Sequence, residues 1–274
     1  MKRPFQFTSL PNKILLYFLS IFLIALVISF GVVYHYGSED IKRRETEILV
    51  TVRELKIDSL RNWMEERKGD IKVIADDRHI REMESLFLEN DIFSESVSDI
   101  KENARQHLLG YLQNFHDYQQ LLIVHPETGE IVLSTTKERE GANVSDRPYF
   151  QIARQSNALT IQQIHYSEIL KKYTLDFSIP ILCLEHEGGH IIGILVARIN
   201  PDISLYPLLS DTTGLGGTGE TFIINREGIV QSPLRWQAEA NLNLKIDTVP
   251  VQRAIQGLTG VAQEKDYRGE NVLF

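Results

Sequence analysis

The chain has a single cysteine, Cys183, among its 274 residues, so no intramolecular disulfide can form. A domain of this size can build a core without such a link, and the lone thiol therefore does not indicate a compartment. The chain also lacks an excess of positive charge, since 29 Lys and Arg stand against 37 Asp and Glu for a net charge of -8. This balance argues against a nucleic-acid partner, because binding to phosphates depends on clustered cations.

One stretch, residues 14–33, lacks charge altogether. As a helix rising about 1.5 Å per residue it spans the roughly 30 Å hydrocarbon layer of a bilayer. Lys2, Arg3 and Lys13 precede it without an acidic residue, so the positive-inside rule places the N-terminus in the cytoplasm. The run is longer than the core of a signal peptide and lacks a small-residue cleavage site. We predict a single uncleaved transmembrane helix over 14–36 in the inner (plasma) membrane, with the bulk of the chain periplasmic or extracellular.

Helical patterns fill the next part of the chain. From Ile41 to Ile74, apolar residues recur at spacings of three, four and seven, with charged residues between them. This pattern predicts a long amphipathic helix that either supports the following domain or pairs with a second copy of the chain, and we expect a homodimer. Residues 76–120 predict a second helical region, with a break between 89 and 98.

The stretch 121–200 has the pattern of a complete folded module. It predicts two strands around a turn over 121–134, a short helix with Asp146 as its cap and Pro148 in its first turn, and two long strands over 173–185 and 190–200. Gly188-Gly189 is a hairpin signal between the long strands. These elements predict a small α+β module, and nothing in it indicates a catalytic centre or a cofactor.

An internal repeat predicts a second module. Ile131-Val132-Leu133-Ser134 returns as Ile229-Val230-Gln231-Ser232, and the strand at 121–125 corresponds to 221–225. The second copy breaks off in an apolar run near 274, so we expect the frame to continue through a last strand, a second transmembrane helix and an output domain. The predicted organisation is a cytoplasmic segment (1–13), a transmembrane helix (14–36), a helical region (37–119), a membrane-distal module (120–200), a linker (201–219) and an incomplete membrane-proximal module (220–274).

Polar residues on the predicted sheet and helix are the candidate binding site. Arg147 beside Tyr149 suits a ligand that carries a carboxylate. Arg198 interrupts an apolar strand and requires a partner, either Asp176 of the neighbouring strand or a bound anion. Tyr166 and Tyr173 are further candidates at the sheet face, and no metal site is predicted.

The segment His186-Glu187-Gly188-Gly189-His190 has the letters of the HExxH zinc motif. Its two glycines and strand-like flanks favour a hairpin turn over the helix that the zinc chemistry requires. A membrane-anchored zinc hydrolase using His186, Glu187 and His190 stays the alternative function, as does an ectodomain that binds no ligand.

The chain resembles the double Cache family of extracytoplasmic sensors over about residues 40–274. The resemblance is carried by the transmembrane helix, the long helix with 60–67, and the segments Asp146-Arg147-Pro148-Tyr149-Phe150, 193–199 and 219–224. It implies two PAS-like modules with antiparallel sheets that sense small molecules for histidine kinases, chemoreceptors or diguanylate cyclases. In amino-acid-binding members an aspartate stands near the position of Arg198. A cation there implies an organic-acid ligand instead.

Overall fold

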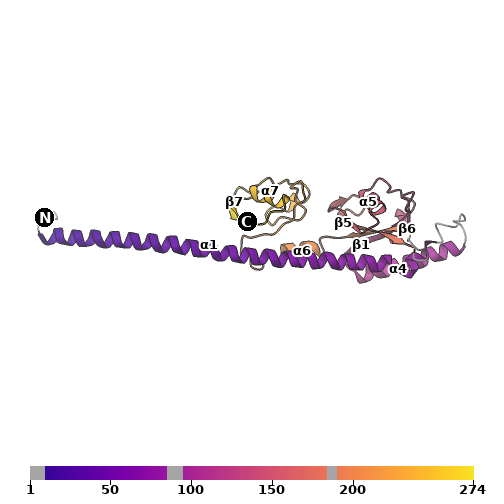
Figure 1. The fold of residues 1–274 in the computed structure, drawn as a ribbon, viewed down its shortest axis with the longest axis horizontal. Helices are drawn as coiled ribbons and strands as arrows, with labels where there is room; N and C mark the ends of the chain where they lie inside the picture. Colours follow the sequence, from indigo (N-terminus) through magenta and orange to yellow (C-terminus); the bar gives the residue numbers. More distant parts are fainter. Residues whose placement is uncertain (1–9, 85–94, 184–189) are drawn as a thin grey trace, which may run out of the picture.

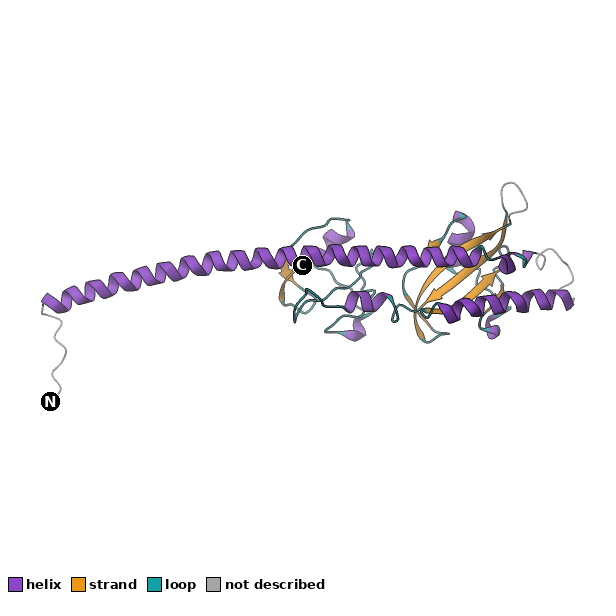
Figure 2. Cartoon of the chain, turned by 90° about the horizontal axis from the view of Figure 1, so that it is seen from below, coloured by secondary structure: helices purple, strands orange, loops and turns teal. Residues whose placement is uncertain are grey.

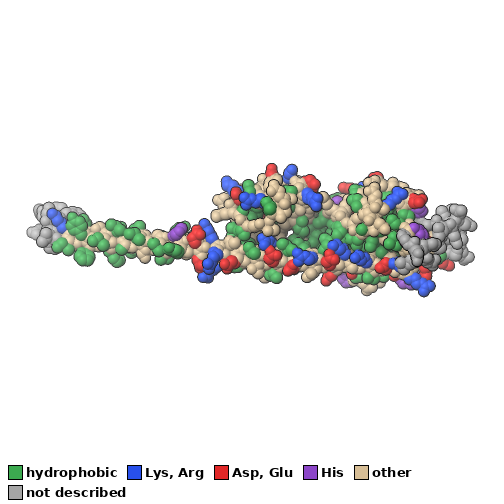
Figure 3. All heavy atoms as spheres, viewed as in Figure 1, with side chains coloured by type: hydrophobic (Ala, Val, Ile, Leu, Met, Phe, Trp, Pro, Cys, Tyr) green, Lys and Arg blue, Asp and Glu red, His purple; other side chains and the backbone are tan. Residues whose placement is uncertain are grey.

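The computed structural model describes residues 10–84, 95–183 and 190–274. Its longest element is α1 (Leu10–Ala75), a single helix of 66 residues, or roughly 100 Å. The predicted membrane span and the predicted amphipathic helix are therefore one uninterrupted element (Figure 1). Apolar side chains cover the free N-terminal part of α1, and charged side chains begin where it nears the folded units (Figure 3). By length and composition, this helix can cross a membrane.

The other end of α1 packs into the core of the folded unit that contains the large sheet. Ile71 and Ile74 are fully buried, and Trp63 is 6% exposed. The Trp63 ring meets Phe177 edge to face, and its Nε1 donates a hydrogen bond of 2.9 Å to Ser204 Oγ. α2 (Arg78–Arg81) follows, and α4 (Glu95–Asn114) runs back beside the end of α1 (Figure 2). The helical break predicted between 89 and 98 lies outside the described residues up to 94, and residues 95–98 already belong to α4.

An antiparallel sheet lies against these helices, with strand order β2-β1-β6-β5-β3 and β4 paired to β5. Its strands are β1 (Tyr118–Val124), β2 (Ile131–Ser134), β3 (Thr160–Ile161), β4 (His165–Ser167), β5 (Lys172–Leu182) and β6 (Ile191–Ile199). Because side chains alternate along a strand, β6 directs Leu195 and Ala197 to the core under α1 and Ile194 and Val196 to the opposite face. The α+β class and the antiparallel sheet predicted from the sequence are confirmed.

The opposite face of the sheet is covered by α5 (Pro148–Ser156), preceded by the short helix η1 (Lys137–Arg139). The prediction that Asp146 caps α5 is wrong, because the N-cap is Arg147, in an extended conformation without a side-chain cap. Pro148 explains the shift, since a proline pushes the residue before it out of the helical region and so sets the boundary there. Tyr149 and Phe150, in the first turn, are both buried against the sheet.

The chain then passes through α6 (Leu205–Ser210) into a C-terminal unit. It contains η2 (Ala238–Ala240), α7 (Val249–Ile255) and the hairpin β7 (Gln263–Lys265) and β8 (Asn271–Leu273), around a small core that includes Val230 and Val251. The predicted strands over 221–225 and 229–232 are wrong, because the described residues form only two isolated bridges there, Ile224 to Val230 and Ile229 to Lys245. The Ile223 amide donates to Ser232 Oγ at 3.0 Å, so a side chain takes the place of a ladder partner.

Candidate functional site

A cavity of about 360 Å³ opens beside the first turn of α5, between η1, β4 and the end of β6. It gathers candidate residues that lie far apart in the sequence. Arg147, Tyr149, Tyr166 and Arg198 line it, together with residues that the sequence did not single out: Arg139, Gln162 and His165. Three arginines thus surround one small space.

Arg198 is the most enclosed of the three, with 5% of its surface exposed. Its Nη1 donates a hydrogen bond of 3.0 Å to Gln120 Oε1, and its Nη2 donates one of 3.3 Å to Tyr149 Oη. The guanidinium also lies over the Tyr149 ring, 5.8 Å from its centroid. Register places Asp176 of β5 directly opposite Arg198, and Nε lies 3.7 Å from Asp176 Oδ1. The partner expected from the sequence is therefore Asp176.

Asp176, a candidate from the sequence, is fully buried and does not itself line the cavity, although its partner Arg198 does. Its Oδ1 accepts a hydrogen bond of 2.8 Å from Thr174 Oγ1, and its Oδ2 lies 3.7 Å from His165 Nε2. Within the described part of the chain, eight buried side-chain atoms lack a hydrogen-bond partner. Three of them belong to the cavity lining, Arg139 Nε, Gln162 Oε1 and Arg198 Nε, and a fourth, Asp176 Oδ2, lies next to the lining residue His165. Because buried polar groups are normally satisfied, this concentration marks the cavity as a place for a polar guest.

The remaining arginines differ in exposure. Arg147, the N-cap of α5, has a side chain that is 60% exposed and lies 3.6 Å from Asp146. Arg139 ends η1, and burial, followed by repulsion from Arg198 and Arg147, lowers the pKa of its guanidinium. Burial also raises the pKa of Tyr149, so its hydroxyl stays protonated and can donate a hydrogen bond. The cavity therefore carries a positive field.

Tyr173 does not line this cavity, and its place corrects the expectation from the sequence. It packs with the core on the α1 side of the sheet, because it alternates with Thr174 and Asp176 along β5. Tyr166 pairs with Tyr173 in register, and their rings meet edge to face at 5.6 Å. Tyr166 therefore lines the cavity although its ring packs against the ring of Tyr173.

Arg139, His165 and Gln120 were missed in the sequence for separate reasons. Arg139 stands in the charged run 137–140, which has the composition of a solvated loop. His165 belongs to a three-residue strand with no periodic signal. Gln120 could have been found, because it is a polar residue entering an apolar strand and is fully buried.

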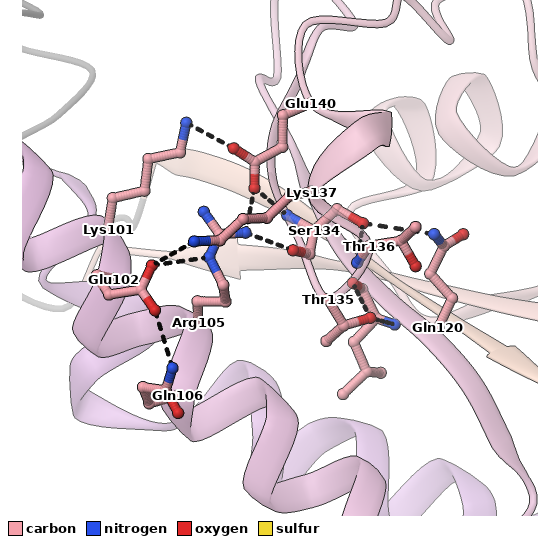
Figure 4. Close-up of polar contacts among 11 residues, drawn as sticks. Lys101, Glu102, Arg105, Gln106, Gln120, Ser134, Thr135, Thr136, Lys137 and Glu140 are labelled. Carbon is pink, nitrogen blue, oxygen red and sulfur yellow. Dashed lines mark hydrogen bonds and ion pairs between the residues drawn. The ribbon is translucent and has the colours of Figure 1, made fainter.

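A buried polar network joins the cavity to α4 (Figure 4). Gln120 Nε2 lies 3.4 Å from Ser134 Oγ, and the Ser134 carbonyl accepts a hydrogen bond of 2.6 Å from Arg105 of α4. Glu140 accepts from the Ser134 amide at 3.0 Å and pairs with Arg105 and Lys101. Hydrogen bonds thus connect Arg198, through Gln120 and Ser134, to a helix beside α1.

A larger cavity of about 420 Å³ lies between α1 and the C-terminal unit. Its lining is mainly apolar, and its cations are already engaged. Lys56 pairs with Asp211, and Arg268 with Asp266. It therefore offers no converging free charge, and the cavity beside α5 is the better candidate for a polar ligand.

Two of the three residues of the alternative zinc site, His186 and Glu187, lie outside the described residues. The third, His190, precedes β6, and its Nε2 lies 3.0 Å from Glu84 Oε1. Both long elements that flank the segment, β5 and β6, are strands, as the sequence predicted.

No family model matches the sequence, and no curated protein matches it. Among solved structures, the ligand-binding domain of the Campylobacter jejuni chemoreceptor Tlp3, in complex with 4-methylisoleucine, is 17% identical with a TM-score of 0.57, over 84% of this chain and 83% of that one. The ligand-binding domain of the Pseudomonas aeruginosa amino-acid chemoreceptor PctC, in complex with GABA, is 15% identical with a TM-score of 0.57, over 83% and 90%. A domain of a sensory-box/GGDEF-family protein from Vibrio parahaemolyticus is 10% identical with a TM-score of 0.58, over 80% and 86%. The chain has the fold of bacterial sensory domains, as the Cache resemblance implied.

Proposed function

We propose that the chain is the extracytoplasmic sensing region of a transmembrane receptor, and that it binds a small carboxylate in the cavity beside α5. The observation that carries this proposal is the convergence of three arginines on one space of about 360 Å³, in whose lining Arg139 Nε, Gln162 Oε1 and Arg198 Nε are buried without a hydrogen-bond partner. The neighbouring structures are ligand-binding domains of the same fold, which supports a sensory role over a zinc hydrolase.

The ligand class follows from the charges. Arg139, Arg147 and Arg198 favour a carboxylate, and each charge-assisted hydrogen bond in such a site contributes roughly 1.5 to 3 kcal/mol. An ammonium group would meet repulsion from the same three cations. Gln162 Oε1 remains in the lining as an acceptor, which a neutral hydroxyl would satisfy. We therefore expect a hydroxy acid to bind more tightly than the matching unsubstituted acid or amine.

α1 connects this cavity to the membrane. The helix packs on β5, the strand that contributes Asp176, and runs on without a break into its apolar N-terminal part. We propose that this part spans the plasma membrane with its N-terminus in the cytoplasm, and that residues 220–274 are part of a second Cache module. A ligand that draws Arg198 toward itself would shift β5 and β6 relative to α1.

The free face of α1 offers a contact for a second copy of the chain. Ile41, Ile48 and Leu55 recur at intervals of seven and are 62%, 42% and 62% exposed. Such a spacing is typical of a helix that pairs in a coiled coil. We propose that the receptor is a homodimer through this face.

The test is a thermal-shift screen of the full chain in detergent, at fixed pH and salt, against short hydroxy acids, unsubstituted acids, amino acids and amines. A ligand at a hundred times its Kd stabilises the folded state by about 2.7 kcal/mol, and the unfolding midpoint rises with it. Arg147→Ala should weaken binding about ten- to hundred-fold, because it removes one charge-assisted contact.

Arg154→Ala is the matched control, since Arg154 lies on the same helix, is exposed and does not line the cavity. It should bind like the parent. Stabilisation by amines alone, or an Arg147 variant that binds like the parent, would contradict the carboxylate site. Hydrolysis of a substrate that stops when zinc is removed would favour the alternative enzyme.

A further inference from the structure

A second group of polar side chains lies at the far tip of the folded unit that contains the large sheet, away from the cavity. Asp77 precedes α2, His79 lies in α2, and His107 lies in the neighbouring α4. The two imidazole rings stack with their centroids 3.7 Å apart. The donor atoms of all three side chains lie within 4.8 Å of one another.

The donor atoms are close enough for one metal ion, but the two rings are stacked only 18° from parallel and must turn before both Nδ1 lone pairs can point at it. His79 Nδ1 lies 3.3 Å from Asp77 Oδ1, and His107 Nδ1 lies 3.5 Å from Asp77 Oδ2. A charge-assisted hydrogen bond would be about 2.7 to 2.9 Å long. In a tetrahedral zinc site, with bonds of about 2.0 to 2.1 Å, adjacent ligand atoms lie about 3.3 to 3.4 Å apart.

The carboxylate is held in place by groups that would not bind the metal themselves. The His79 amide donates to Asp77 Oδ1 at 2.8 Å, and the Tyr111 hydroxyl donates to Oδ2 at 3.0 Å. Hydrogen bonds of this kind orient the ligands of metal sites and raise their affinity. His79 and His107 are 36% and 37% exposed, so an ion can reach the imidazoles from solvent.

We propose that Asp77, His79 and His107 bind a divalent transition-metal ion, with zinc the best fit to two imidazoles and one carboxylate. This donor set suits zinc, copper or nickel and does not suit calcium or magnesium, which take mainly oxygen ligands. The fourth coordination position is left to water. No local pattern in the sequence predicts this site, because its two histidines are far apart along the chain and lie in different helices.

A metal here would fasten the end of α1 to α4. Asp77 and His79 follow α1 by only a few residues, and α2 packs against α4. α4 also carries Arg105, the helix end of the network that reaches Arg198. The ion would therefore act on the same two helices as the ligand cavity but from a separate place.

The experiment is zinc titration of the untagged full chain in detergent, in competition with a chromogenic chelator. We expect one zinc per chain, a rise in the unfolding midpoint with zinc, and no effect of magnesium or calcium at the same concentration. His79→Ala and His107→Ala should each weaken zinc binding at least hundred-fold, and Tyr111→Phe about tenfold. Cobalt should give the visible absorption of a tetrahedral site in the parent and lose it in both histidine variants.

Two further variants keep the result decisive. His116→Ala removes an exposed histidine just after α4 and should bind zinc like the parent. His190→Ala tests the other group of potential ligand atoms, Glu84, Cys183 and His190. Zinc binding that is lost in the His190 variant, or that persists in the His79 and His107 variants with unchanged metal-free unfolding midpoints, overturns the proposal. Because the carboxylate screen needs no metal and the zinc titration needs no carboxylate, either proposal can fail without the other.

Discussion

The ion pair between Arg198 and Asp176 allows a test that separates stability from ligand binding. Its members are 5% and 0% exposed, and Nε and Oδ1 are 3.7 Å apart without a direct hydrogen bond. Replacing Arg198 with Met leaves a buried carboxylate supported only by Thr174 and His165. Breaking a buried pair typically costs 3 to 5 kcal/mol, so the midpoint should fall by about 6 to 20 °C.

Asp176→Asn should cost less, about 2 kcal/mol, because Arg198 keeps its hydrogen bonds to Gln120 and Tyr149. In the double variant neither charge is left unpaired, and we expect a coupling energy of about 2 kcal/mol. The effects on binding should diverge. Arg198→Met should abolish carboxylate binding, whereas Asp176→Asn frees the guanidinium and should preserve or tighten it.

The assay is thermal unfolding of the full chain in detergent, followed by the emission of Trp63, which is buried beside Phe177. Trp236, which is 48% exposed, is replaced by Phe in every variant so that one reporter remains. Arg154→Met serves as the exposed control. Additive single costs, or loss of ligand binding in Asp176→Asn, would refute the reasoning.

Three further predictions follow from single features of the fold. Burial opposes ionisation of Glu140, but hydrogen bonds from Arg105, Lys101 and the Ser134 amide outweigh it and lower its pKa. Its contribution to stability is therefore present above the unfolded pKa of about 4.3 and is lost as the pH falls through the lower folded pKa. Glu140→Gln should melt earlier than the parent at pH 7 and lose less between pH 5 and pH 3; equal slopes would contradict this. Ile48→Cys in a Cys183→Ala chain should cross-link into a dimer, whereas Arg43→Cys, exposed on another side of α1, should not. Gly129→Ala should lower the thermal midpoint more than Gly141→Ala. Both glycines have positive φ, but only at Gly129 would a new Cβ meet Ser145, at 2.5 Å. Equal decreases in the midpoint would contradict a role for this close contact.

The sequence predicted those parts of the fold that depend on local pattern. The uncharged run and the apolar stripe gave α1, and the β-branched runs gave β1, β2, β5 and β6 close to their observed bounds. The boundary of α5 failed by one residue, because the effect of Pro148 on its predecessor outweighed the capping preference of Asp146. The strands predicted over 221–225 and 229–232 do not form, because only isolated bridges join this stretch and the Ile223 amide bonds to the Ser232 side chain.

The candidate site was predictable only where one residue broke a pattern. Arg198 stood out in an apolar strand, and alternation along β5 then brought Asp176 to the same face. Tyr173 was misplaced although alternation along β5 puts it on the face opposite Asp176, an odd number of residues away. Arg139 and His165 reach the cavity through tertiary packing of short segments, for which no local pattern exists.

Because α1 is one continuous helix, the number of residues between its apolar segment and the sheet sets how far the sheet is rotated about the helix axis. Each residue turns a helix by about 100° and lengthens it by about 1.5 Å. One residue added between Tyr36 and Ile48 would swing the sensory unit by more than a quarter of a circle relative to the apolar segment, while lifting it very little. Seven added residues would nearly restore the original heading and raise the unit by about 10 Å. A change in the length of α1 therefore alters the rotation of the sensory unit about the helix axis more than it alters the distance of that unit from the apolar segment.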